Sequence, residues 1–305
     1  MNIIEKKEDL LKLENNTFKG NLPEMNNSKI IFNGNNNILF CDKKVILNNS
    51  IIEFNGDNSI IFLASNSHEY RLSFSVNHNS TLYIDKNNYF NDKLHVILSE
   101  ESNLIIGKNS LFSFGIWIRT ADPHLIYDSK TRLRINKSKS VYIGDHVWIG
   151  QDALILKGTK IDSGSIIGAA SVVSGKIIKN NRVYAGNPVK LVRKNIFWNE
   201  SCVHKWKKNN TKNSLDYDKF ISKKPNLTKT QFIYKYNKKE SIGYDEIEKN
   251  LKDKNIDERY EYILNLYKNE DKNRFVNKIK KKRKNILNKY ILLLKRKRRM
   301  ILNRK

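Results

Sequence analysis

The sequence has little proline and cysteine for its length, and it lacks a long hydrophobic run. Only four of its 305 residues are proline, and the two cysteines, Cys41 and Cys202, match no metal-ligand spacing. No apolar run approaches the roughly twenty residues of a membrane-spanning helix. Residues 1–16 are charged where a secretory signal has an apolar core. These absences argue against a disulfide framework and a membrane span, and they predict a cytoplasmic protein with reduced thiols.

Acidic residues are missing from the last part of the chain. Residues 272–305 contain sixteen Lys or Arg and no Asp or Glu, so they supply most of the net charge of +26. Two basic clusters flank the apolar run 290–294. We expect residues 276–305 to lie on an anionic membrane at the inner face of the cytoplasmic membrane, or to hold a polyanionic glycan. A solvated tail is the simpler alternative, and no other feature of the sequence favours nucleic acid.

The N-terminal half of the chain has a 22-residue repeat. Equivalent segments begin at Gly34, Gly56, His78 and Glu100, and each places short β-prone runs beside a corner rich in Asn, Ser, Gly and Asp. Units of this size cannot bury a core alone, so they must stack on one another.

From Val141 the period becomes six. Aliphatic residues occupy every sixth position, and we expect the frame to resume at Ala185 and Leu191; the first members are Ile143, Ile149, Ile155, Ile161, Ile167 and Val173. Four places after each stands a smaller or β-branched residue: Val147, Ala153, Thr159, Ser165, Ser171 and Ile177. Glycines follow the aliphatic position at 144, 150 and 168, where a positive φ is expected. This pattern predicts an all-β solenoid of triangular coils, whereas a right-handed solenoid would use longer and less regular coils.

The six-residue frame breaks between Arg119 and Ser140, and four motifs begin there. In order they are Ile118-Arg119-Thr120-Ala121-Asp122-Pro123-His124-Leu125-Ile126-Tyr127-Asp128, Ile143-Gly144-Asp145-His146-Val147-Trp148-Ile149-Gly150, Gly168-Ala169-Ala170-Ser171-Val172-Val173, and Ala185-Gly186-Asn187-Pro188-Val189-Lys190-Leu191-Val192-Arg193. Together they resemble the hexapeptide-repeat O-acetyltransferases that act on maltose, galactosides and capsular polysaccharides. The resemblance implies a left-handed parallel β-helix, in which the 22-residue units are wider coils.

The resemblance also implies that His124 is a general base. An imidazole within reach of a sugar hydroxyl can remove its proton as the oxygen attacks a thioester. Asp122 or Asp128 would orient the ring, unless a backbone carbonyl does so and both are turn residues. Trp148 matches a tryptophan that the family places beside the histidine, although it could simply cover the solenoid flank. We expect His146 to be a surface or packing residue.

Acetyl-CoA is the co-substrate that the resemblance implies. Its implied contacts are Gln151, Ala169, Ser174, Lys190 and Arg193, the last two pairing with phosphates. The family further implies a groove between the subunits of a homotrimer. We expect no metal, because zinc on such a solenoid wants three histidines and only His124 and His146 lie in suitable coils.

Beyond the coils we expect an α-helical, strongly basic appendage. A helical pattern starts at Tyr244, with apolar positions at Ile247, Leu251, Tyr260, Ile263, Leu264 and Tyr267. Phe197, Trp198 and Trp206 are expected to cover the end of the solenoid. The predicted divisions are an N-terminal segment 1–27, the β-helix 28–195, an aromatic and basic linker 196–243 and a helical basic region 244–305.

These features favour acetyl transfer to a hydroxyl of a bacterial capsular or lipo-oligosaccharide glycan, an anionic polysaccharide with sialic acid as the favoured sugar. Two alternatives stay open at this point. The acceptor could be a small sugar or nucleotide sugar. The chain could instead be a non-catalytic glycan-binding or membrane-binding solenoid, in which case His124 and Trp148 would be dispensable.

Overall fold

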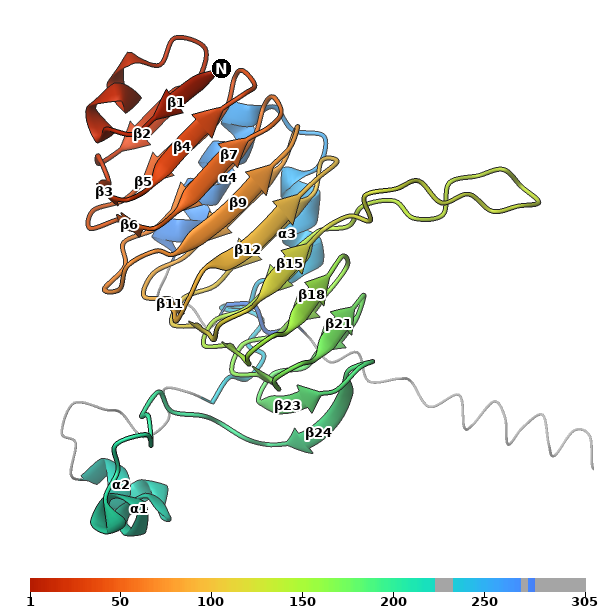
Figure 1. Ribbon diagram of the computed structural model, residues 1–305. Coiled ribbons are helices and arrows are strands. Elements are labelled where there is room, and N and C mark those ends of the chain that lie inside the picture. Colours follow the sequence, from red (N-terminus) through yellow and green to blue (C-terminus); the bar gives the residue numbers. More distant parts are fainter. Residues whose placement is uncertain (223–232, 270–273, 278–305) are drawn as a thin grey trace, which may run out of the picture.

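The computed structural model describes residues 1–222, 233–269 and 274–277. The membrane-surface expectation for 276–305 therefore falls almost wholly outside the described residues. The chain winds into a β-helix with three long sheets (Figure 1). Within the described residues no helix combines the length and apolar character needed to cross a membrane.

Each sheet forms one side of the coils. The first sheet contains, in spatial order, β1 (Asn2–Ile4), β4 (Lys29–Phe32), β7 (Ile51–Phe54), β9 (Leu72–Val76), β12 (Leu94–Leu98), β15 (Trp117–Arg119), β18 (Leu154–Leu156) and β21 (Val172–Ser174). The second contains β2 (Thr17–Gly20), β5 (Ile38–Cys41), β8 (Ile60–Leu63), β10 (Thr81–Ile84), β13 (Asn103–Ile106), β16 (Val141–Ile143), β19 (Lys160–Ile161) and β22 (Ile177–Ile178). The third contains β11 (Tyr89–Phe90), β14 (Leu111–Phe112), β17 (Trp148–Ile149), β20 (Ile166–Ile167), β23 (Arg182–Ala185) and β24 (Lys190–Lys194), and β3 (Glu24–Asn26) pairs with β6 (Ile46–Asn48).

The strand register confirms the six-residue period up to Val173 and, over the repeats that begin at Gly34, the 22-residue period with one exception. Between β8 and β10 the step is 21 residues, so Ile60 pairs with Thr81 and not with the expected Leu82. In the wide coils Leu72 pairs with Leu94, one 22-residue repeat further on, and in the narrow coils Ile155 pairs with Val173, three six-residue units further on. The predicted inward positions Ile143, Ile149 and Ile161 are fully buried. The core is therefore a column of aliphatic and aromatic side chains inside the coils.

Asparagines make the corners of the wide coils. Asn36, Asn58 and Asn79 have φ values of 54°, 58° and 52°, a left-handed conformation that asparagine tolerates better than most residues. The Nδ2 of Asn36 donates to Oδ1 of Asn58 at 2.6 Å, so the corner side chains also form a ladder between coils. This explains why asparagine recurs at the same corner of successive coils, 22 residues apart from Asn36 to Asn58 and 21 apart from Asn58 to Asn79.

The glycines of the six-residue frame serve a different purpose from the expected one. Gly144, Gly150 and Gly168 do not have positive φ. A Cβ at Gly150 would lie 2.6 Å from the Ala169 nitrogen, and one at Gly144 would lie 2.7 Å from the Ser163 nitrogen. The next coil approaches too closely for a side chain, and that approach, rather than backbone conformation, requires glycine here.

The expected frame is wrong after Val173. Ile161 pairs with Ile178, one position short of three six-residue units, and Ile178 rather than Ile177 is buried. The corner at Gly175, with φ of 59°, is therefore shorter by one position than the corners before it. Leu191 is 39% exposed, because β24 turns back antiparallel to β23 instead of starting another coil.

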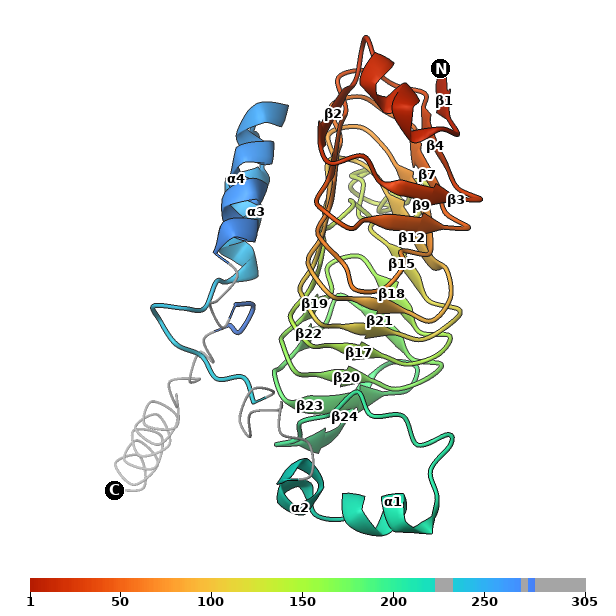
Figure 2. The ribbon, with the colours of Figure 1, turned by 90° about the vertical axis from the view of Figure 1, so that its left-hand side faces the viewer.

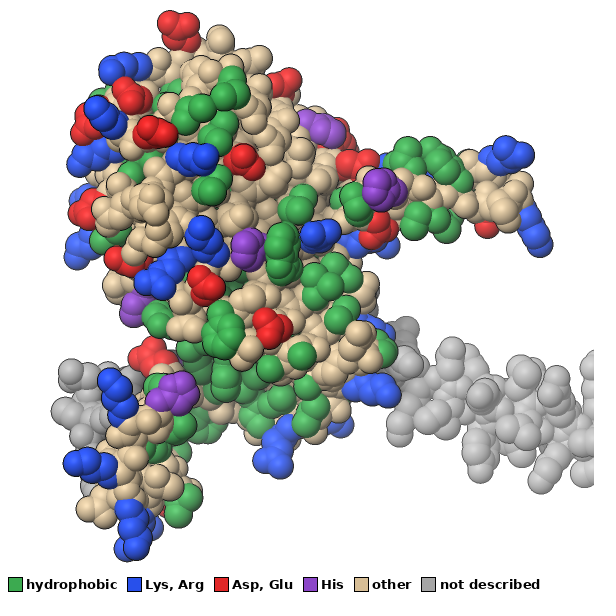
Figure 3. Space-filling model, in the orientation of Figure 1, with side chains coloured by type: hydrophobic (Ala, Val, Ile, Leu, Met, Phe, Trp, Pro, Cys, Tyr) green, Lys and Arg blue, Asp and Glu red, His purple; other side chains and the backbone are tan. Residues whose placement is uncertain are grey.

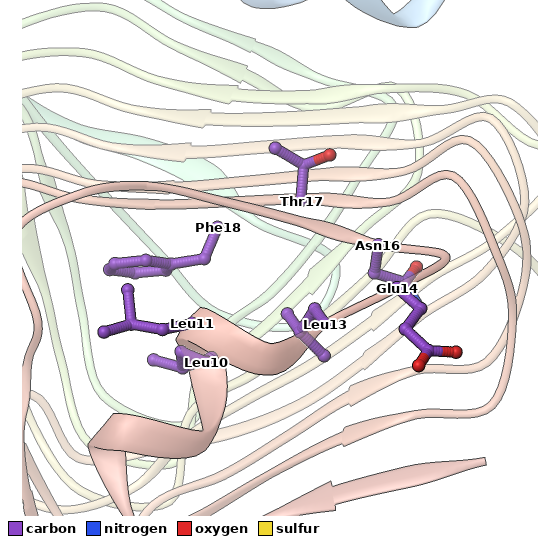
Figure 4. Close-up of a pocket in the computed structure, with 7 residues that line it drawn as sticks. All are labelled: Leu10, Leu11, Leu13, Glu14, Asn16, Thr17 and Phe18. Carbon is purple, nitrogen blue, oxygen red and sulfur yellow. The ribbon is translucent and has the colours of Figure 1, made fainter.

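The N-terminal end of the solenoid begins earlier than the expected boundary at residue 28. Strands β2 and β3 already belong to coils, and the 3₁₀ helix η1 (Lys7–Lys12) places Leu10 over the core. A hollow of about 300 Å³ opens there, lined by Leu10, Leu11, Leu13, Glu14, Asn16, Thr17 and Phe18 (Figure 4). These residues lie in the first coil, far from the four motifs.

In the part of the chain that the structure describes, four α-helices follow the coils: α1 (Lys208–Ser214), α2 (Tyr217–Ser222), α3 (Tyr244–Leu251) and α4 (Ile256–Lys268). As predicted, the segment from Tyr244 is helical, and α3 and α4 lie along the second sheet (Figure 2). Ile247 and Ile263 bury their side chains in one cluster with Phe62 and Tyr83 of that sheet. Trp198 packs on the solenoid, whereas Trp206 contacts Phe220 of α2 and not the coils.

Candidate active site

The break in the six-residue frame is a projecting arm, residues 120–139 (Figure 1). It leaves the corner between β15 of the first sheet and β16 of the second. Its two limbs pair, with Ile135 N donating to Ile126 O at 2.9 Å and Asp128 N donating to Leu133 O at 2.9 Å. The arm is thus a hairpin-like extension of a rigid coil, the setting in which functional loops are usually found.

An ion pair anchors the arm to the wide coils. Both terminal nitrogens of Arg134 donate to the Glu100 carboxylate, at 2.7 and 2.8 Å, and Ser138 Oγ donates to it at 2.5 Å. These donors lower the pKa of Glu100 to about 2. The carboxylate therefore stays charged at neutral pH and holds the returning limb of the arm.

His124 lies exposed on the outgoing limb. Its backbone oxygen accepts a hydrogen bond of 2.7 Å from Asn136 Nδ2, and Asn136 Oδ1 accepts one of 2.9 Å from Ile126 N. Buried Asn136 thus fixes the backbone from the carbonyl of His124 to the amide of Ile126, directly after the histidine. Sequence reasoning missed this residue, since an asparagine twelve positions away carries no local signal.

The two candidate partners of His124 are engaged elsewhere. Lys157 Nζ donates to Asp122 Oδ2 at 2.5 Å, which lowers the pKa of Asp122. Asp128 accepts hydrogen bonds from the backbone of Lys130 and Thr131, so it is a turn residue. Among the described residues neither carboxylate contacts the imidazole of His124.

Trp148 lies on the outer side of β17 with 39% of its surface exposed. Its ring is 6.0 Å from that of Trp198. Trp198 stacks on His146 at 3.9 Å, donates from Nε1 to His146 O at 3.0 Å, and accepts at its own backbone oxygen a contact of 3.1 Å from His146 Nε2. Burial lowers the pKa of His146 to about 4, so this ring packs as a neutral group.

The five candidate donor residues fall into separate places. Gln151 and Ala169 stack at the corner between the third and first sheets, where Ala170 N donates to Gln151 O at 2.7 Å. Ser174 ends β21 at the corner from which the arm leaves. Lys190 and Arg193 are exposed on β24, and neither has an ion-pair partner in the part of the chain that the structure describes.

Comparison with known proteins shows which family and which solved structure this chain is similar to. Residues 140–175 match the family described as bacterial transferase hexapeptide (six repeats). The hexapeptide repeat thus lies in the narrow coils of the β-helix. In the crystal structure of the polySia specific acetyltransferase NeuO, the similar region covers 68% of this chain and 93% of that one, with 25% identity and a TM-score of 0.54. The expected left-handed parallel β-helix is thereby confirmed.

Similar sequences match over shorter segments. The polysialic acid O-acetyltransferase of Escherichia coli O1:K1 / APEC is 32% identical over 81 residues, 27% of this chain and 26% of that protein. The polysialic acid O-acetyltransferase of Neisseria meningitidis is 32% identical over 90 residues, 30% of this chain and 42% of that protein. A putative lipopolysaccharide biosynthesis O-acetyl transferase of Escherichia coli K12, WbbJ, is 44% identical over 62 residues, 20% and 31% of the two chains. The matches thus span less than half the length of each of these relatives.

The candidate site residues form two groups, which lie on different parts of the β-helix. The arm group, His124, Asp122 and Ser174, lies at the corner between the first and second sheets. The flank group, Trp148, Gln151 and Ala169, lies on the third sheet and at its corner with the first. Within the described ranges no contact joins His124 to Trp148. In one copy of the chain the arm group and the flank group therefore stay apart.

The arm also exposes an apolar surface. Five of its side chains are between 48% and 67% exposed: Leu125, Ile126, Tyr127, Leu133 and Ile135. A cluster of large apolar side chains on a projecting hairpin has no interior to face, which is typical of a segment that contacts another molecule.

Proposed function

We propose that this chain is an acetyl-CoA-dependent O-acetyltransferase whose acceptor is a sugar hydroxyl of an anionic, sialic acid-containing glycan polymer. The observation that carries the proposal is His124 held on a braced arm that leaves a hexapeptide-repeat β-helix. Two similar proteins are named polysialic acid O-acetyltransferases, which supports the acceptor class. A sugar hydroxyl needs a base and a thioester needs no protein nucleophile, so one histidine suffices for the proton transfer.

In the proposed reaction the His124 imidazole takes the proton of the acceptor hydroxyl. The oxygen attacks the thioester carbonyl, and a C–O bond forms. The C–S bond then breaks, and the leaving thiolate recovers the proton from the imidazolium. The products are the acetyl ester and free coenzyme A, and the imidazole returns to its neutral form. The Asn136 bonds to the His124 carbonyl and the Ile126 amide hold the backbone directly after the base in place.

The residues proposed for the donor fit the chemistry of coenzyme A. Ala169 and Ala170 are small and exposed, so an extended pantetheine arm can approach the backbone at that corner. Gln151 offers an exposed amide beside them, and Ser174 offers a hydroxyl at the arm's corner. Lys190 and Arg193 present cations to solvent, and cations of this kind bind phosphate.

We further propose that a second copy completes the site, in a homotrimer. The arm of one subunit would bring His124 against Trp148 and the donor groove of its neighbour. The apolar side chains of the arm support this arrangement, because they need a surface to cover them. A peripheral position on the inner face of the cytoplasmic membrane is a proposal from the basic sequence 276–305 alone.

The decisive experiment measures thiol release from acetyl-CoA by the full-length protein with purified polysialic acid, a neutral dextran, monomeric sialic acid and nucleotide sugars as acceptors. We expect release with polysialic acid, and a fall of roughly 10²–10⁴-fold in the His124→Ala variant. His204→Ala is the matched control, because His204 is exposed in the linker after the coils. Thiol release by His124→Ala equal to that by the native protein would refute His124 as the base. Thiol release with small sugars but not with polysialic acid would show that the acceptor is a small sugar and not the polymer.

A further inference from the structure

The outer face of the first sheet carries a stacked group beside the arm, made of His95, Trp117 and Arg119. The rings of His95 and Trp117 lie 4.4 Å apart and within 14° of parallel. The guanidinium carbon of Arg119 lies 5.0 Å from the centre of the Trp117 ring. Trp117 remains 36% exposed, and its strand β15 leads directly into the arm. The group is therefore a partly exposed aromatic platform with a cation over the Trp117 ring.

The strand register shows how this face changes along the solenoid. Ser73, His95, Trp117, Leu154 and Val172 form one outward row across successive coils. Ser75, Ile97, Arg119, Leu156 and Ser174 form the next. The outer face thus carries two hydroxyls on the coil of Ser73 and Ser75, with Ile51 and Glu53 on the coil before it. It is aromatic and cationic beside the arm, and mainly apolar on the narrow coils, where Ser174 is the polar member of the rows.

The charges around the platform favour an anion. No carboxylate pairs with Arg119 in the part of the chain that the structure describes, although its guanidinium is half-buried against an aromatic ring. The arm above it carries the exposed cations Lys130, Arg132 and Lys137. Asp92 and Lys93 are the charged groups near His95, and they have opposite signs. Figure 3 shows both Lys or Arg and Asp or Glu side chains on this face, so the preference for an anion rests on Arg119 itself.

We propose that His95, Trp117 and Arg119 form an acceptor subsite that binds a carboxylated sugar residue of the polymer next to the one that is acetylated. This proposal rests on the proposed function for its reaction, and it adds where the polymer lies. The apolar C–H face of a pyranose packs on the Trp117 ring, and the sugar carboxylate pairs with the Arg119 guanidinium, which suits planar anions. His95 supports the ring from behind. The polymer then continues toward Ser73 and Ser75 on the wide coils.

The binding test uses the full-length protein without donor. Affinity electrophoresis in gels containing polysialic acid measures the dissociation constant of the native protein, the Trp117→Ala and Arg119→Gln variants, and the conservative Trp117→Phe. We expect each of the first two substitutions to weaken binding roughly tenfold, and Trp117→Phe to retain most of the affinity, because a ring remains. Tyr236→Ala and Lys254→Gln are matched controls, since Tyr236 is 40% exposed and Lys254 is a cation paired with Glu258.

The kinetic test separates the subsite from the catalytic centre. With polysialic acid as acceptor we expect Trp117→Ala to raise KM while leaving kcat within about twofold, because the subsite binds a neighbouring residue and not the reacting atoms. Monomeric sialic acid has no neighbouring sugar residue to place in the subsite while it is acetylated. Its kcat/KM therefore stays unchanged in the Trp117→Ala variant. Equal losses for monomer and polymer would overturn the proposal, as would unchanged polymer affinity in both single variants.

The two proposals can fail independently. The native protein could bind polysialic acid without releasing thiol from acetyl-CoA, and the Trp117→Ala variant could fail to bind the polymer. The subsite would then stand and the transferase proposal would fail. If thiol is released with the polymer while both single variants bind it like the native protein, the transferase stands and the subsite is wrong. Melting temperatures equal to that of the native protein identify variants that have kept their fold.

Discussion

At the scale of single residues, Lys157 decides what Asp122 does. The two side chains come from the arm and from the following coil, and Lys157 Nζ also donates to Asn136 O at 3.1 Å. The lysine thus ties both limbs of the arm to the solenoid. We interpret Asp122 as a residue that positions the root of the arm rather than one that orients the His124 ring.

This interpretation predicts a mild phenotype for Asp122→Asn. An amide can still accept a hydrogen bond from Lys157, so we expect kcat/KM to fall less than about tenfold, far less than in His124→Ala. The pH profile of kcat/KM should keep its shape, because the partner of the base is unchanged. A profile whose lower limb moves in Asp122→Asn, and not in the control Asp128→Asn, would instead assign Asp122 to the imidazole.

A second residue-scale feature is the buried guanidinium of Arg274. It is completely buried, forms an ion pair with buried Asp85, and lies 3.5 Å from Asp145 Oδ1. Its backbone oxygen accepts a hydrogen bond from Ser163 Oγ at 3.1 Å. The segment after α4 is therefore fastened to three coils, one of which carries the motif Asp145-His146-Val147-Trp148.

Removing this guanidinium should destabilise the protein strongly. Arg274→Met leaves two buried carboxylates without their cation, which costs about 3–5 kcal/mol in the free energy of unfolding. Burial raises the pKa of Asp145 to about 6, so the folded state binds a proton that the unfolded state has released between pH 4 and 6. The cost of the substitution is therefore expected to be larger at pH 8 than at pH 5.

Urea unfolding at both pH values measures this difference. The matched control is Lys254→Met, which removes a cation from an exposed pair and should change stability by less than about 1 kcal/mol. The double variant Arg274→Met with Asp85→Asn should recover part of the loss. A loss in Arg274→Met no greater than in Lys254→Met would show that the buried pair does not secure the segment.

At the scale of elements, the arm is structurally separable from the coils. Thr120 O accepts a hydrogen bond from Lys139 N at 3.0 Å, so the two ends of the arm already lie together. Thr120 is buried and bonds to Ser102 Oγ at 2.7 Å, which keeps this corner closed. The coil below the arm does not need the arm to complete its strands.

We therefore expect a variant with residues 122–137 replaced by a short Gly-Asn turn to fold. The lost Arg134–Glu100 pair is partly exposed and contributes about 0–1 kcal/mol, so the melting temperature should change by only a few degrees. Transferase activity should disappear with the base. Loss of the cooperative melting transition would show that the arm is part of the solenoid's core structure.

At the scale of the whole molecule, the distance between the arm group and the flank group bears on the proposed trimer, in which each group would be one half-site. His124 and Trp148 occupy different sides of one coil, so the proposed trimer would draw the two residues of one site from two subunits. Chains carrying His124→Ala and Trp148→Ala are each expected to be inactive alone. Refolded together, a random mixture should regain up to about a quarter of the native activity, because a quarter of the interfaces pair one intact half-site with the other.

Mixing the two variants without refolding is the control, since preformed assemblies keep their defective sites. Sedimentation velocity on the same samples reports the size of the assembly. No recovery after refolding, in the presence of mixed assemblies, would place both residues of a working site on one chain.

The sequence by itself determined the solenoid. Each inward position recurs with a fixed period, so the aliphatic residues of the 22-residue and six-residue frames report the coil directly, and the break from Arg119 to Ser140 reports the arm. The helices that begin at Tyr244 could also be predicted from the sequence, since their apolar residues repeat with the helical period. Local periodicity is enough for all of these, because each depends only on neighbours along the chain.

Which charged side chains pair with one another depends on the tertiary structure. Lys157 reaches Asp122, and Arg274 reaches Asp85, from distant parts of the chain, and no spacing in the sequence announces either pair. Glycine is required at 144 and 150 because the backbone of the next coil approaches closely there. The short corner at Gly175 shifts the last inward positions by one residue. Stacking of coils brings distant residues together and sends His124 and Trp148 to different sides, because position around a coil depends on the lengths of its corners.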